Sequence, residues 1–144
     1  MVDSFEVKEI CSEGYERWIK VLSLSSNIIY WLHFIEHDEF LENKEITKKL
    51  NIGDTIKGKI KIDLVTEYKI IKNISNCDYG FVQSIDGSSS VIATGVVKEI
   101  EDSYTVICSI NKLGNNIVVE FERKINVEFG QIIEIRGSLE LERE

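Results

Sequence analysis

Alternation of hydrophobic and polar residues marks much of this chain as β-strand. The clearest run covers residues 56–70, where apolar side chains and charged side chains occupy alternate positions. A period of two residues is typical of a strand with one buried face and one solvated face. Similar patterns predict strands over residues 91–100, 104–110, 116–122 and 131–142. We therefore expect the second half of the chain to be all β.

The run over residues 56–70 is too long to stay straight in a small domain. At ~3.3 Å per residue it would extend about 50 Å, so we expect it to bend at Gly58 or between Asp63 and Thr66. Its predicted buried face carries Ile56, Gly58, Ile60, Ile62, Leu64, Thr66, Tyr68 and Ile70, and its predicted solvated face includes Lys57, Lys59, Lys61, Asp63, Val65 and Glu67.

The first 50 residues have a less regular pattern. Residues 4–11 and 15–24 are predicted strands around a turn at Ser12-Glu13-Gly14, although residues 15–24 also fit a short helix. Residues 28–35, IIYWLHFI, are apolar on both faces, which predicts a strand buried on both sides or a seam between two layers. Apolar residues within 39–50 follow helical spacing and predict a short helix.

Two shorter features complete the pattern. Residues 80–85 predict a short strand, and the small polar residues 86–90 predict a mobile hairpin tip. Residues 50–54 and 127–131 both read apolar, polar, apolar, Gly, polar, and each precedes a predicted strand. This echo fits a turn that swings the chain into a barrel strand.

Residues 93–141 resemble an OB-fold, a small five-stranded barrel. The matching segments are GVVKEI at 95–100, YTV at 104–106, IVVEF at 117–121 and FGQIIEIRGSL at 129–139. The resemblance implies a barrel and a family in which one face often binds oligonucleotides. Only residues 123–128 are available for the helix that OB-folds usually carry between the third and fourth strands, and that segment is too short.

The expected fold class is therefore mainly β, either a small OB-like barrel or a β-sandwich with additional N-terminal strands and at most one or two short helices. We expect one domain over residues 1–144, in which residues 1–50 form an N-terminal extension packed on a core of residues 51–144.

Composition narrows the class of protein. Hydrophobic residues make up 43% and charged residues 29% of the 144 residues, as in a globular domain. The three cysteines form no C-x-x-C, which disfavours a disulfide framework or a zinc ribbon, and Cys108 is expected in the core. With no apolar leader and no stretch of ~20 apolar residues, the expected location is the cytoplasm, without membrane contact.

Catalytic chemistry is not evident from the sequence. No nucleophile or phosphate-binding motif occurs, and no carboxylate lies within an apolar run. His33 and His37 are weak metal candidates, because on a strand they would lie ~13 Å apart, too far to share one ion. We therefore expect no enzyme activity, no cofactor and no metal.

Charge points to a partner. The net charge of −8 favours a basic protein, and the acidic residues Glu36, Asp38, Glu39, Glu42 and Glu45 are the expected protein-binding site. The predicted function is a non-catalytic inhibitor or immunity-type protein that neutralises a basic bacterial toxin such as a nuclease. The sequence leaves the oligomeric state open.

The alternative is a binder of single-stranded nucleic acid. Lys57, Lys59 and Lys61 share one strand face at a spacing of ~7 Å, which suits phosphates, and Tyr68, Tyr79 and Phe81 are the aromatic residues available for stacking on bases. Carboxylates on the same face and the acidity of the whole chain disfavour this alternative.

Overall fold

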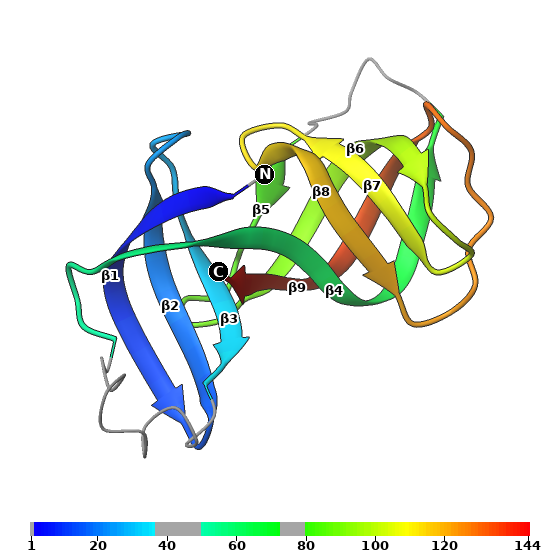
Figure 1. Ribbon diagram of the computed structural model, residues 1–144. Helices are drawn as coiled ribbons and strands as arrows, with labels where there is room; N and C mark the ends of the chain where they lie inside the picture. The colour runs from blue at the N-terminus through cyan, green and yellow to red at the C-terminus, as the bar shows by residue number, and fades with distance from the viewer. Residues whose placement is uncertain (1, 37–49, 73–79) are drawn as a thin grey trace.

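The protein is built from β-strands. The computed structural model describes residues 2–36, 50–72 and 80–144, and these contain no helix, which confirms the mainly β fold class (Figure 1). The strands are β1 (Asp3–Glu13), β2 (Glu16–Ser23), β3 (Ile29–Ile35), β4 (Thr55–Ile71), β5 (Phe81–Val82), β6 (Ser90–Ile100), β7 (Thr105–Ile110), β8 (Gly114–Phe121) and β9 (Ile132–Arg143).

All strands belong to one sheet, and part of this sheet closes into a ring. Strands β6, β7 and β8 are joined as consecutive antiparallel neighbours, and β9 returns to pair with β6. This is the strand order of a Greek key. β4 fills the space between β9 and β8, antiparallel to β9 and parallel to β8. The closed ring is therefore β4–β8–β7–β6–β9.

A second ring shares the same two long strands. β1, β2 and β3 are consecutive antiparallel neighbours, and β4 pairs with β1. Here β9 fills the remaining space, parallel to β3 and antiparallel to β4. Figure 1 shows β4 and β9 running between the group β1–β3 and the group β6–β8. Each three-stranded group is thus closed by both long strands.

The strands β1–β3 and the strands β6–β8 pair in the same register. Val7 pairs with Val21, which pairs with Tyr30. In the other half Val97 pairs with Cys108, which pairs with Ile117. The expected boundary after residue 50 falls between β3 and β4, and the hydrogen-bonded sheet continues across it.

The turns that lead into β4 and β9 are also alike. Gly53 and Gly130 adopt positive φ angles of 95° and 85°, a conformation that glycine reaches without steric cost. The sequence echo at 50–54 and 127–131 therefore marks two equivalent turns, as predicted. In the first turn Val7 exchanges hydrogen bonds with Gly53 and Asp54, and in the second Val97 does so with Gly130 and Gln131.

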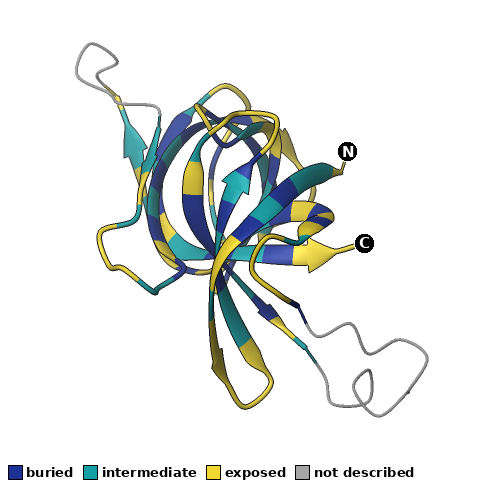
Figure 2. Cartoon of the chain, turned by 90° about the vertical axis from the view of Figure 1, so that its left-hand side faces the viewer, coloured by how far each residue is buried: buried dark blue, intermediate teal, exposed yellow. Residues whose placement is uncertain are grey.

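Buried apolar side chains from both rings form one continuous cluster, while exposed residues gather at turns and hairpin ends (Figure 2). Cys108 is fully buried and Trp31 is 6% exposed, which confirms their expected burial. The predicted double-sided burial of residues 28–35 holds at Tyr30, Trp31 and Leu32, which are buried in succession, and is wrong at Ile29 and Ile35, which are 51% and 55% exposed.

β4 bends within the predicted segment 63–66. Its register with β9 shifts between Asp63 and Glu67, and Leu64 has a positive φ of 57°. This bulge reverses the alternation, because it inserts extra residues into one strand of the ladder. Leu64 is 58% exposed and Val65 only 1%, so the predicted faces were wrong at the bulge. Beyond it they hold again, because Tyr68 and Ile70 pack against the core while Glu67 and Lys69 are exposed.

Other local predictions need correction or fall outside the described residues. Residues 15–24 contain a strand and not a helix. The strand predicted over 80–85 shortens to β5, and the predicted mobile tip over 86–90 is wrong at Ser89, which is 5% exposed and bonded to Ser138. The helix predicted over 39–50 lies outside the described residues except for Leu50.

Candidate functional site

Of the five acidic residues predicted to bind a partner, only Glu36 lies among the described residues. Glu36 directs its carboxylate at Arg17, with Oε2 3.8 Å from Nε, and the Glu36 side chain is only 11% exposed. Its backbone N–H donates to the carbonyl of Tyr15. Glu36 therefore fastens the end of β3 to the β1–β2 hairpin. Asp38, Glu39, Glu42 and Glu45 lie outside the described residues.

The three lysines of the predicted basic stripe share one face of β4, but carboxylates surround them. Lys61 Nζ lies 3.5 Å from Glu120 and 3.9 Å from Asp63. Lys59 pairs across the ladder with Glu142. Lys57 and Lys59 are exposed, and Lys61 is partly buried. The face therefore carries mixed charge and not a continuous positive field.

Two of the three aromatic residues expected to stack on bases, Tyr68 and Phe81, pack against other rings. Tyr68 packs edge-on against Phe121 at 5.6 Å, and its hydroxyl accepts a hydrogen bond from the N–H of Asn126. Phe81 packs edge-on against Tyr30, also at 5.6 Å. Tyr79 lies outside the described residues. Neither Tyr68 nor Phe81 therefore lies with its ring against Lys57, Lys59 and Lys61.

His33 lies at the centre of a polar chain that links three strands. Its Nδ1 is 2.7 Å from Glu140 on β9, and its Nε2 is 3.2 Å from Glu16 on β2. Ser138 donates to the other oxygen of Glu140 at 2.6 Å and shares a 2.7 Å hydrogen bond with Ser89. Sequence reasoning missed the carboxylates, because they lie 17 and 107 residues from His33 along the chain.

The chain of polar groups is suited to holding strands together. Both ring nitrogens of His33 are engaged by carboxylates, and neither approaches a hydroxyl or thiol that it could activate. Among the described residues no group of three or more His, Cys, Asp and Glu side chains could hold a metal ion. His37, the other metal candidate, lies outside the described residues.

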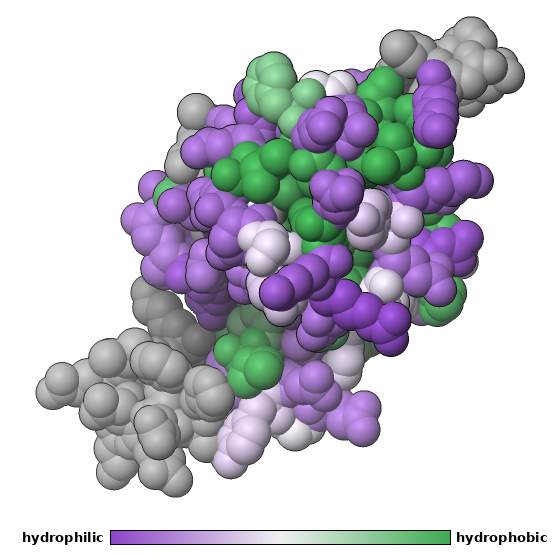
Figure 3. Space-filling view, turned by 90° about the vertical axis from the view of Figure 1, so that its right-hand side faces the viewer, coloured by the Kyte–Doolittle hydropathy of each residue, from purple (hydrophilic) through white to green (hydrophobic). Residues whose placement is uncertain are grey.

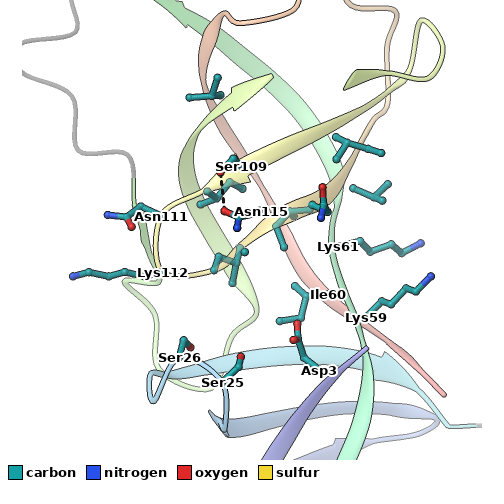
Figure 4. Close-up of a pocket in the computed structure, with 18 of the residues that line it drawn as sticks. Asp3, Ser25, Ser26, Lys59, Ile60, Lys61, Ser109, Asn111, Lys112 and Asn115 are labelled. Atoms are coloured by element: carbon teal, nitrogen blue, oxygen red, sulfur yellow. Dashed lines mark hydrogen bonds between the residues drawn. The ribbon is translucent and has the colours of Figure 1, made fainter. Parts of the chain in front are cut away.

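A groove of about 920 Å³, lined by polar and aliphatic residues, opens between the two halves. We call it the saddle groove. Ser25 and Ser26 of the β2–β3 turn line it from one half, and Asn111 and Lys112 of the β7–β8 turn line it from the other (Figure 4). Figure 4 shows the lysines of β4 pointing outward at the side of this groove. Asp3, Glu101, Glu120 and Glu142 also line it, so its charge is mixed.

A second groove, of about 490 Å³, lies between β3 and residues 81–86. We call it the edge groove. Three of its apolar residues remain exposed, Ile29 at 51%, Val82 at 55% and Ile85 at 58%. The buried Trp31 also lines it, and the Trp31 indole N–H donates to Asp86 at 3.1 Å. This groove combines exposed aliphatic walls with a fixed aromatic residue.

Gln83 binds the backbone of Trp31 beside this groove. Its Oε1 accepts the Trp31 N–H at 2.7 Å, and its Nε2 donates to the Trp31 carbonyl at 2.8 Å. The carboxamide thus makes both hydrogen bonds that a neighbouring strand would make. It covers part of an open strand edge.

Apolar side chains also reach the surface in the other half. Figure 3 shows them as patches among hydrophilic residues on the right-hand side of the molecule. Phe129, in the turn before β9, is the extreme case at 78% exposed. Its counterpart in the turn before β4 is Ile52, at 68%. These are isolated turn residues and line neither groove.

Two buried titratable groups, Cys108 and Tyr30, belong to the core, and Tyr30 also lines the edge groove. Burial raises the pKa of the Cys108 thiol to about 12. Burial also raises the pKa of Tyr30, which a hydrogen bond with Ser23 partly opposes. Both groups therefore stay neutral at physiological pH.

No protein-family model, no curated protein and no solved structure matches this chain. In the described part of the chain no helix is long and apolar enough to cross a membrane.

Proposed function

We propose that this chain is a non-catalytic domain that binds another protein. The observation that carries this proposal is the edge groove, where three aliphatic residues stay more than half exposed around one concavity. Exposed apolar patches with polar rims are typical of protein interaction sites.

The expected partner is a basic protein. A net charge of −8 attracts positively charged surfaces and speeds their association. In its sharpest form the proposal is an inhibitor or immunity-type protein that covers the active site of a basic bacterial toxin, such as a nuclease. In that form the acidic surface steers the partner and the edge groove provides apolar contact.

A non-catalytic role agrees with the chemistry of the described residues. His33 is held between two carboxylates, and the buried thiol and phenol have raised pKa values. A nucleophile needs a lowered pKa or an adjacent base. Neither condition is met at these groups.

Affinity capture tests this function. The full chain is immobilised and exposed to lysate at low and high salt, beside the variants Ile85→Glu and Ile52→Glu. Ile52 is as exposed as Ile85 but lies outside the groove, so it controls for the added charge. We expect a specific basic partner that is toxic when expressed without this chain. Absence of any saturable partner under all conditions would contradict the proposal.

Single-stranded nucleic acid remains the alternative ligand. A ring of five strands that includes residues 93–141 supports an OB-like interpretation, in which β4 supplies the fifth strand. Lys59 and Lys61 line the saddle groove beside amide side chains, which favours this alternative. Fluorescence titration with oligonucleotides would detect binding that weakens steeply with salt and fails in Lys59→Glu. The mixed charge of this face leads us to rank it second.

A further inference from the structure

We infer that the edge groove binds an extended segment of the partner protein as an added β-strand along β3. The segment would carry branched aliphatic side chains at alternate positions and few charges. This inference rests on the proposed protein-binding function and specifies its site and mode. Strand addition supplies affinity through backbone hydrogen bonds and specificity through pockets for alternate side chains.

The first argument is a difference between the two rings. β8 pairs with β4 at Val118, Val119 and Phe121. In the repeated register the counterpart of β8 is β3, yet β3 pairs with β9 only at His33. Among the described residues, Ile29 meets no partner strand on this edge of β3 and Trp31 is bonded there by the Gln83 side chain, whereas the same edge of β8 is covered by β4.

The second argument is that this edge already binds an amide. Trp31 is the counterpart of Val118, and the side chain of Gln83 takes the place of the missing strand there. A side-chain carboxamide presents the same donor and acceptor as a peptide group. Because successive residues of a strand alternate in direction, the N–H and C=O of Ile29 point to the same side as those of Trp31. The groove thus continues a hydrogen-bonding edge suited to peptide groups.

The third argument concerns the walls and charges of the groove. Ile29 comes from β3 and Val82 and Ile85 come from residues 81–86, so aliphatic side chains of two segments line the groove. Two of the three charges at the rim are engaged. Lys20 pairs with Glu9 at 3.1 Å, and Asp86 accepts the indole N–H of Trp31. A strongly charged segment would find little complementary charge here, which favours an apolar occupant.

Peptide selection tests the inference. A random peptide library displayed on phage is panned against the biotinylated full chain, and the most enriched peptide is synthesised with a fluorescein label. Fluorescence anisotropy then compares the wild type with Ile29→Glu, Ile85→Glu and the control Ile52→Glu. Circular dichroism and thermal unfolding establish that each variant is folded.

We expect enriched peptides with alternating aliphatic residues, and a loss of affinity of at least about tenfold in both groove variants. Affinity in the control should change by less than about twofold. Hydrogen exchange at the Ile29 amide should slow when the peptide binds, as a new backbone bond requires.

Other results would overturn the inference. A bound peptide that is helical, or that binds equally well to the groove variants, excludes strand addition at β3. A dimer of the free chain that Ile29→Glu dissociates would show a second copy to be the occupant. A partner captured from lysate whose binding ignores Ile85→Glu would refute this site and leave the protein-binding function intact. Failure of both experiments would refute the function as well.

Discussion

Gly53 and Gly130 occupy the same place in the two halves of the molecule. Each has a positive φ, each donates its N–H to a valine carbonyl at 2.8 Å, and each precedes one of the two shared strands. Such agreement in backbone geometry and bonding identifies the turn as the element that directs each long strand across the fold. The loss of stability that another residue causes at this positive-φ position can be measured.

Replacing either glycine by alanine should destabilise the protein by about 1–2 kcal/mol, because a Cβ disfavours positive φ. No atom lies within 4 Å of the added Cβ at either position, so the cost comes from the backbone alone. Urea unfolding of Gly53→Ala and Gly130→Ala should give losses of similar size. Asparagine tolerates this conformation better and should lose less at both positions. Unchanged stability in both alanine variants would contradict this account of the turns.

Gly137→Ala should cost more than either turn variant, for a different reason. A Cβ at Gly137 would lie 2.6 Å from the carbonyl oxygen of Asp63 and 2.8 Å from Val65 Cγ2. These atoms belong to the bulge in β4, which is packed inside the ladder and has little room to move. The urea midpoint should therefore fall further than in Gly53→Ala. An equal or smaller fall would mean that the bulge can shift to admit a methyl group.

Much of the fold could be predicted from the sequence because strand periodicity is local. The alternation over 56–70 and 131–142 located the two long strands, and the length of the first required the bend found at Asp63. The reversal of faces at Leu64 and Val65 could not be predicted. It depends on which residue the partner strand leaves unpaired.

The pairing of β4 with both β8 and β9 could not be predicted from local sequence patterns, because it joins segments far apart in the chain. One signal was available for the repeat. Val7-Lys8-Glu9-Ile10 and Val97-Lys98-Glu99-Ile100 are identical, and each contains the bulge at the same position. The edge groove had no such signal, since Ile29 and Ile85 meet only through the tertiary fold.

The polar chain through His33 should contribute to stability. His33→Ala leaves the half-buried Glu140 without its 2.7 Å partner, and we expect a loss of about 1–3 kcal/mol. Glu16→Gln is the matched control, because the Glu16 side chain is 50% exposed and its contact with His33 should contribute less than about 1 kcal/mol. Urea unfolding of His33→Ala, Glu140→Gln and the double variant measures the coupling between the two residues. Additive losses would show that the 2.7 Å contact has no energetic role.

Cys11 and Cys108 should differ sharply in reactivity, since Cys11 is exposed and Cys108 is buried. Cys77 lies outside the described residues, so the comparison uses a Cys77→Ser background. A thiol reagent should label Cys11 in the native protein and Cys108 only after unfolding, because the thiolate is the reactive form and burial disfavours it. Rapid labelling of Cys108 in the folded state would contradict its place in the core.

The same burial makes stability depend on alkaline pH. Burial raises the pKa of Cys108 from its ordinary value of 9.0 to about 12 in the folded chain, so the unfolded chain releases this proton first. Between these values stability should fall as pH rises, by up to about 1.4 kcal/mol per pH unit for one group. Tyr30 acts in the same direction, because burial also raises its pKa. Urea midpoints measured from pH 9 upward should therefore decline less steeply in Cys108→Ala than in the wild type, while Cys11→Ala should follow the wild type. If the urea midpoint of both variants fell with pH as steeply as that of the wild type, the alkaline loss of stability would come from groups other than Cys108.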